Sequence, residues 1–348
     1  MAVVTSDSLH VADALDGITL RRLGRLERLV GPETYRLLRG LVSNPLSVTG
    51  LIIISFFAAV ALAAPVLAPV VNVRNPYQVP RDGYTPEPKA PGTVWQMRPP
   101  ALPVWWQTVF HTNKWVHILG TASGQWDIWY GIVWGARTAF RVGIICTFST
   151  LLIGVVIGAL AGYYGGLVDT LLMRVTEIFI AIPFFMAALI FAAVITPIIG
   201  KGELPSVIAL IAFGWMRYAR LVRGDILSLK ERDYVLAARV TGARDRRILL
   251  RHIIPNAIYP TLVIASLEIG QFVLNFAALS FLGIGTEMGY ADWGQILSFA
   301  RNFIPVLGHY WYILVYPGIT VLLFVLGWNL LGDAVRDIMD PKMRGRGA

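Results

Sequence analysis

The chain has 348 residues, of which 56% are hydrophobic and only 15% are charged. In ordinary soluble domains about a quarter of the residues are charged. This composition therefore excludes an ordinary soluble enzyme and indicates a polytopic membrane protein. The formal net charge of +9 allows a nucleic-acid partner or the basic excess that membrane proteins keep in the cytoplasm. The single cysteine, Cys146, excludes a disulfide within the chain.

Six stretches approach the roughly 20 apolar residues that a helix needs to cross a membrane. They are residues 46–70, 139–162, 171–195, 205–221, 258–284 and 312–331. The predicted fold class is therefore an all-α polytopic membrane protein with about six transmembrane helices. A polar leader of about 45 residues precedes the first stretch and is too long for a signal peptide, so we expect an uncleaved signal anchor.

The spans divide the chain into five parts. Residues 1–45 form a cytoplasmic amphipathic segment, in which leucines at every third position between residues 18 and 29 suit a helix lying on the membrane or a solvated one. Residues 46–70 form the first transmembrane helix, and residues 71–137 an external segment rich in tryptophan and proline. The main transmembrane domain covers residues 138–335, with a cytoplasmic loop at 223–256, and residues 336–348 form a cytoplasmic tail.

The basic residues orient these spans. In the arrangement with six spans, one side of the membrane receives 21 lysines and arginines and the other receives nine. Because basic residues concentrate in cytoplasmic loops, we expect both termini in the cytoplasm. The concentration of basic residues on the cytoplasmic side then explains the positive net charge of the chain, and we expect no nucleic-acid partner.

The external segment is unusual because residues 71–135 hold seven of the eleven tryptophans, together with many prolines. The prolines exclude a long helix, and the aromatic content argues against disorder. Two interpretations remain open. The segment is a compact cap with indole rings at the headgroup level, or it is a platform on which carbohydrate stacks.

The sequence offers no enzyme motif and no metal site. The five histidines have no pair at the spacing of a helical zinc site, and neither a Gly-x-Ser-x-Gly nor a Walker motif is present. We therefore predict no catalytic residue, no metal ligand and no bound cofactor. Gly154, Gly158 and Gly162 recur every four residues, a spacing that predicts close approach of another helix.

Charges inside the spans are the remaining candidates. Arg174 and Glu177 are spaced for an ion pair within one helix. Glu268 lies deep in the fifth span, and Gln271 and Asn275 follow it on the same helical face. A carboxylate at that depth faces a polar cavity or a partner. The stripe predicts either the wall of a translocation path or hydrogen bonds between helices.

The cytoplasmic stretch 234–256 predicts a helix, a glycine turn and a second helix that Pro255 closes. In the first helix the small face of Tyr234, Ala237, Ala238 and Thr241 permits close approach of a partner surface. In the second helix Leu249, Leu250 and Ile253 face one side, and three arginines at positions 244, 247 and 251 face the other. Anionic membrane lipid is a plausible contact of these arginines.

This loop resembles the "EAA" loop of binding-protein-dependent ABC importer permeases. The matching residues are Ala237, Ala238, Gly242 and Pro255, whereas Leu236 stands where many members have Glu and His252 where many have Ile. Flanking segments such as "SNPLSVTGL", "GYYGGLVDTLLMR", "FLGIG" and "ADWGQIL" resemble the C-type subunit of dipeptide and oligopeptide permeases. The resemblance runs from about residue 43 to 341, but "LGTASGQWDIW" at Leu119 departs from the usual pattern.

The resemblance implies a type I ABC importer in the plasma (inner) membrane of a prokaryote. Its partners would be a B-type permease subunit, two ATPase subunits that use ATP and Mg, an external substrate-binding lipoprotein and membrane lipid. It assigns ATPase coupling to Tyr234, Ala237, Ala238, Arg239, Thr241, Gly242, Ala243 and Pro255. Peptides are the expected cargo. Oligosaccharide and nickel are alternatives within this class, and an ion-coupled secondary transporter that uses Glu268 is the alternative from another class.

Overall fold

The computed structural model describes residues 44–97 and 99–339, so the amphipathic segment expected at residues 18–29 lies outside the described residues. Helices dominate the described part, which contains no β-strand beyond four isolated bridges. This confirms the predicted all-α class. The first half of the chain begins with α4 (Pro45–Leu67), α5 (Val104–Phe110), the short 3-10 helix η1 (Ser123–Gln125) and α6 (Ile128–Tyr164). It continues with α7 (Gly166–Ile180) and α8 (Phe184–Ile199).

The second half of the chain begins with α9 (Leu204–Gly214) and α10 (Met216–Leu229), followed by the short helices α11 (Asp233–Val240) and α12 (Asp245–Ile248). A π-helical turn, η2 (Leu249–Ile253), leads directly into α13 (Ile254–Phe281). The chain ends with α14 (Trp293–Phe299), the 3-10 helix η3 (Ala300–Val306), α15 (Leu307–Tyr310) and α16 (Tyr312–Met339).

Four helical segments among the described residues are long and apolar enough to cross a membrane. They are α4, α6, the continuous run from α12 through α13, and α16 up to Arg336. A fifth span is possible if α7 and α8, which meet at 85°, cross together. The predicted span at 205–221 falls on α9 and the start of α10, which are separate helices of 11 and 14 residues, so the count is four or five where the sequence predicted about six.

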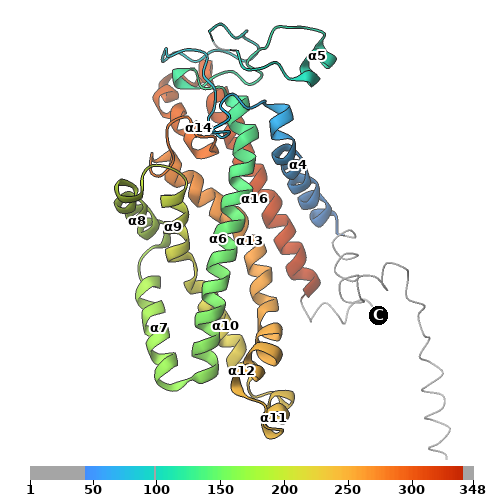
Figure 1. Cartoon of the computed structure of the whole chain (residues 1–348), viewed down its shortest axis with the longest axis vertical. Helices are drawn as coiled ribbons and strands as arrows, with labels where there is room; N and C mark the ends of the chain where they lie inside the picture. Colours follow the sequence, from blue (N-terminus) through green and yellow to red (C-terminus); the bar gives the residue numbers. More distant parts are fainter. Residues whose placement is uncertain (1–43, 98, 340–348) are drawn as a thin grey trace, which may run out of the picture.

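The spans stand side by side, with the segment around α5 at one end of the molecule and α11 and α12 at the other (Figure 1). The long helix α6 packs against α10, α13 and α4, and α16 packs against α4 and α13. The molecule is therefore one helical bundle with a non-spanning segment at each end (Figure 1). The loop whose sequence predicts an ATPase contact lies at the end opposite the tryptophan-rich segment.

The glycine spacing in α6 serves the contact with α10, as predicted. A Cβ atom on Gly154 would lie 2.4 Å from Cβ of Tyr218, and one on Gly158 would lie 2.5 Å from the carbonyl oxygen of Ala219. On Gly162 it would lie 3.0 Å from the carbonyl oxygen of Arg223. These distances leave no room for a side chain, so the three glycines let the two backbones touch.

The tryptophan-rich segment is a compact cap, and its indole rings form its core. Trp95, Trp106, Trp115, Trp126 and Trp134 are buried in one cluster, and Trp105 and Trp129 are partly buried against it. Rings packed edge to face in this way stabilise a core, as at Trp106 and Trp115, whose centroids lie 4.9 Å apart. Five of the seven rings are therefore buried, which favours the compact cap over a platform for carbohydrate stacking.

Candidate coupling surface and translocation path

The helix α11 projects from the end of the bundle opposite the cap and is held by one buried side chain. Val235 is fully buried in an apolar cluster that includes Val222 and Ile226 of α10 and Ile248 of α12. The other residues of α11 are exposed or half-buried, because the helix has only eight residues and one anchored face. This geometry leaves most of α11 exposed while fixing it to the bundle.

Gly242 ends α11 in the way that its position predicts. Its φ is +79°, in the left-handed region that favours glycine. The Ala243 N–H donates to the Ala238 carbonyl oxygen, and the Gly242 N–H donates to that of Arg239, both at 3.0 Å. This pair of bonds is the Schellman motif, which satisfies the last carbonyl groups of a helix. The chain then reverses into α12.

The exposed surface of this loop matches the predicted face except at one residue. Tyr234 is 43% exposed, and Ala237, Arg239 and Thr241 are also exposed. Ala238 and Ala243 are half-buried and pack against the apolar cluster below. The small-residue face is therefore available for a close contact through Ala237, whereas Ala238 brings α11 close to its own bundle.

The second helix of the loop differs from the prediction in two respects. Leu250 is 53% exposed instead of facing inward with Leu249 and Ile253, and Ile248 takes the buried position. The π-helical turn at residues 249–253 changes the helical register here. Pro255 does not close the helix, because it lies in the first turn of α13, where a missing N–H costs nothing.

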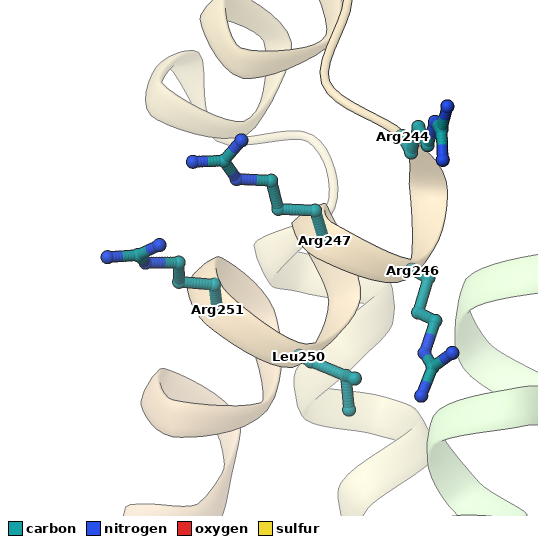
Figure 2. A pocket seen from close by; sticks show the side chains of 5 residues that line it. All are labelled: Arg244, Arg246, Arg247, Leu250 and Arg251. Carbon is teal, nitrogen blue, oxygen red and sulfur yellow. The ribbon is translucent and has the colours of Figure 1, made fainter.

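Four arginines surround a shallow pocket of about 330 Å³ on this second helix: Arg244, Arg246, Arg247 and Arg251, with Leu250. Arg247 and Arg251 extend side by side from successive turns, while Arg244 and Arg246 point in other directions (Figure 2). None of the four forms an ion pair with another residue in ranges 44–97 and 99–339. The pocket is therefore an uncompensated positive surface, suited to phosphate or carboxylate groups.

Polar bonds tie the loop to the end of the bundle opposite the cap. The Tyr163 hydroxyl at the end of α6 donates to Oδ1 of Asp245 at 2.6 Å. Nearby, Arg223 of α10 donates two hydrogen bonds to Asp169 of α7, at 2.5 and 2.6 Å. Such charge-assisted bonds are stronger than neutral ones. The Tyr163 bond thus joins the start of α12 to the end of α6.

The predicted polar stripe lies on an accessible face of α13. Gln271 is exposed and Asn275 is half-buried, with its Nδ2 donating to the Gln271 carbonyl oxygen at 2.8 Å. Glu268 accepts a hydrogen bond from Arg217 of α10, with Nη1 and Oε1 2.8 Å apart. The bond from Arg217 fits the alternative of hydrogen bonds between helices, and the wall of a translocation path stays a prediction.

A second polar cluster was not predicted from the sequence. Arg141 of α6 lies 2.6 Å from Oε2 of Glu203, before α9, and 2.5 Å from the hydroxyl of Tyr290. Tyr290 also donates to Glu203 at 3.0 Å and stacks on Tyr77. An arginine in the first turns of a predicted span, facing an acidic residue in an external loop, is the signal that could have found it. The predicted pair of Arg174 and Glu177 is present at 3.4 Å.

Comparison with known proteins identifies the family. Residues 154–345 match the model of the binding-protein-dependent transport system inner membrane component, and residues 35–81 match the N-terminal TM domain of oligopeptide transport permease C. The chain is 33% identical over 305 residues to the dipeptide transport system permease protein DppC of Alkalihalophilus pseudofirmus, covering 87% of this chain and 88% of that protein.

Two further relatives extend this finding. The glutathione transport system permease protein GsiD of Pectobacterium atrosepticum is 37% identical over 228 residues, which are 66% of this chain and 73% of that protein. The oligopeptide transport system permease protein OppC of Bacillus subtilis is 35% identical over 228 residues, which are 66% of this chain and 72% of that protein. The resemblance to C-type permeases is confirmed, and the chain belongs to the family of membrane components of binding-protein-dependent transport systems.

Proposed function

We propose that this chain is the C-type permease subunit of an ATP-driven importer of di- or oligopeptides and forms half of the translocation path. The exposed loop of α11, Gly242 and α12 is the observation that carries the proposal. It combines a small-residue contact surface with rigid links into the bundle. Relatives named for dipeptides, glutathione and oligopeptides support peptides as the cargo.

The chain depends on partners for energy and for cargo delivery. A B-type permease completes the path, two ATPase subunits bind the α11 loops and use ATP with Mg, and an external lipoprotein delivers peptide. In the proposed transporter, this chain itself binds no cofactor. Both termini lie in the cytoplasm, and the arginine pocket beside Leu250 is a secondary contact for anionic lipid headgroups.

Movement of the ATPases is transmitted through named contacts. When the ATPases close on ATP, they displace α11, which Val235 fixes to α10 and α12. The bond between Asp245 and Tyr163 carries that displacement to α6, and the continuous helix from α12 to α13 carries it to the polar stripe. Because packed helices move as rigid bodies, the spans rock between inward- and outward-open arrangements.

A reconstitution experiment tests this function. Proteoliposomes containing this chain, its B-type partner and both ATPases are supplied with the binding lipoprotein and labelled di- to pentapeptides. We expect peptide accumulation that needs both ATP and the lipoprotein. Uptake of an oligosaccharide or of nickel in place of peptide would reassign the cargo, and uptake driven by a proton gradient without ATP would contradict the proposal.

The secondary-transporter alternative has little support. Its coupling site would be Glu268, whose carboxylate is already compensated by Arg217 at 2.8 Å. The family to which the chain belongs is defined by binding-protein-dependent transport. The argument for oligosaccharide cargo was the tryptophan-rich segment. That argument is weakened, because these tryptophans are packed into the core of the cap.

A further inference from the structure

Arg217 is a cation at the depth of the membrane spans. It is the second residue of α10 and follows the apolar helix α9. Its neighbour Tyr218 touches the Gly154 position of α6, which lies well inside that 37-residue spanning helix. A charged side chain at this depth is costly unless it faces a partner or water. The position of Arg217 therefore requires a polar surrounding in the assembled transporter.

The ion pair of Arg217 and Glu268 is asymmetric. The Glu268 side chain is only 15% exposed, whereas that of Arg217 is 71% exposed. A guanidinium group has five N–H donors, and one of them bonds to Glu268 Oε1 at 2.8 Å. Glu268 therefore binds one N–H group of Arg217 at the surface of the bundle, while most of the Arg217 side chain stays exposed.

The surface next to this pair is polar as well. Gln271 is exposed one turn beyond Glu268, and Asn275 follows one turn later on the same face of α13. Uncharged amides beside a cation favour contact with water over contact with lipid tails, and the side chains at positions 268, 271 and 275 form a polar strip. We interpret the strip and Arg217 together as one wall of a water-accessible path. This interpretation rests on the proposed function.

We propose that Arg217, positioned by Glu268, binds the C-terminal carboxylate of the peptide inside the translocation path. Guanidinium matches carboxylate with two parallel hydrogen bonds. The C-terminal carboxylate is the one acidic group that every unmodified peptide carries, whatever its side chains. A single arginine can thus serve peptides of many sequences, and the amides at positions 271 and 275 contact the backbone without selecting side chains.

The test compares a peptide with its C-terminal amide in the same reconstituted transporter. Uptake of each form is measured with wild type, Arg217→Gln, Arg217→Lys and Glu268→Gln. The preference of the binding lipoprotein is common to all variants, so it cancels when the ratio of acid to amide uptake is compared between them. Arg174→Gln is the matched control, because Arg174 also pairs with a glutamate but lies on α7.

We expect Arg217→Gln to lower uptake of the free acid by about 10- to 100-fold and uptake of the amide by less than about twofold. Arg217→Lys gives an intermediate loss, and Arg174→Gln gives none. An equal loss of both forms, or no loss, overturns the assignment. A wild-type transporter that takes up no peptide overturns the proposed function as well, so the two failures are distinct.

The exchanged pair Arg217→Glu with Glu268→Arg separates recognition from structure. It keeps an ion pair between α10 and α13, and co-purification with the partner subunits shows whether the transporter assembles. We expect assembly without uptake of the free acid. Restoration of free-acid uptake to the wild-type level would show that the pair is only structural and would overturn the proposal.

Discussion

Nδ1 of His117 lies 2.7 Å from Oδ2 of Asp127, and both side chains are buried at the base of the cap. The other ring nitrogen lies 3.2 Å from Oδ2 of Asp82. Asp127 also caps the N-terminus of α6 by accepting a hydrogen bond from the Tyr130 N–H. The histidine therefore joins two distant parts of the cap to the first turn of α6.

Asp82 makes the stability of the cap sensitive to acid. Burial alone would raise the pKa of Asp82, but hydrogen bonds from Lys89, the Met97 and Gln96 N–H groups and His117 together hold that pKa well below its usual value of 3.8. A carboxyl with a lowered pKa stabilises the fold above its unfolded pKa, and the contribution is lost as the pH falls toward the folded pKa.

We expect Asp82→Asn to lower the free energy of unfolding by about 3–5 kcal/mol at pH 7, because it leaves buried basic partners uncompensated. The difference from wild type should shrink below about pH 4. Thermal unfolding of the purified chain in detergent between pH 7 and pH 3 measures it. A difference that stays constant over this range would contradict the account.

The contact of α6 with α10 should not tolerate a side chain at Gly158. A Cβ there would lie 2.5 Å from a backbone oxygen, which cannot move aside as a side chain does. We expect Gly158→Leu to destabilise the chain by at least about 1–3 kcal/mol and to reduce its level in membranes. Gly224→Ala is the control, since nothing lies within 4 Å of that position and alanine favours a helix. Similar levels of the two variants would argue against the close packing.

The bond between Tyr163 and Asp245 should matter for coupling more than for folding. Tyr163→Phe removes one hydrogen bond to a charged group, which is worth about 1.5–3 kcal/mol. We expect the transporter to assemble and hydrolyse ATP but to import fewer peptides per ATP. Tyr164→Phe, at an exposed neighbour, should leave this ratio unchanged. The ratio is measured as labelled uptake against phosphate release, and an unchanged ratio in Tyr163→Phe would rule out this link.

Gly242 should be essential for the shape of the coupling loop. Gly242→Val places a β-branched residue in the left-handed region, which costs at least about 1–2 kcal/mol, and distorts the end of α11. We expect assembly and ATP hydrolysis without uptake. Gly92→Val in the cap carries the same backbone penalty in equally open space, and it should keep uptake. Normal uptake by Gly242→Val would count against the loop as the coupling element.

Local patterns in the sequence were sufficient for much of this structure. The glycines of α6 and the turn at Gly242 were predicted because their spacing and backbone requirements act over a few residues. The predicted number of spans was too high, because the apolar stretch at residues 205–221 is divided between the separate helices α9 and α10. Leu250 was placed on the wrong side because a π-helical turn changes the register, and periodicity at 100° per residue does not reveal such a turn.

Pairs that join distant segments were not predicted. Arg217 and Glu268 are 51 residues apart, Arg141 and Glu203 are 62 apart, and His117 and Asp82 are 35 apart. Each partner alone looks like an isolated charge whose neighbour depends on how the helices pack. The stripe at Glu268, Gln271 and Asn275 was visible from helical spacing, but the cation beside it was not.

The most direct test of the central claim is the contact that α11 makes in the assembled transporter. Cys146 is fully buried, so a cysteine introduced at Ala237 is the reactive thiol in the variant Ala237→Cys. We expect a short thiol-to-amine cross-linker to join it to an ATPase subunit, and an impermeant maleimide added outside intact cells to leave it unlabelled. Gln107→Cys in the exposed helix of the cap should give the reverse pattern. Labelling of Ala237→Cys from outside, with no ATPase adduct, would contradict the account.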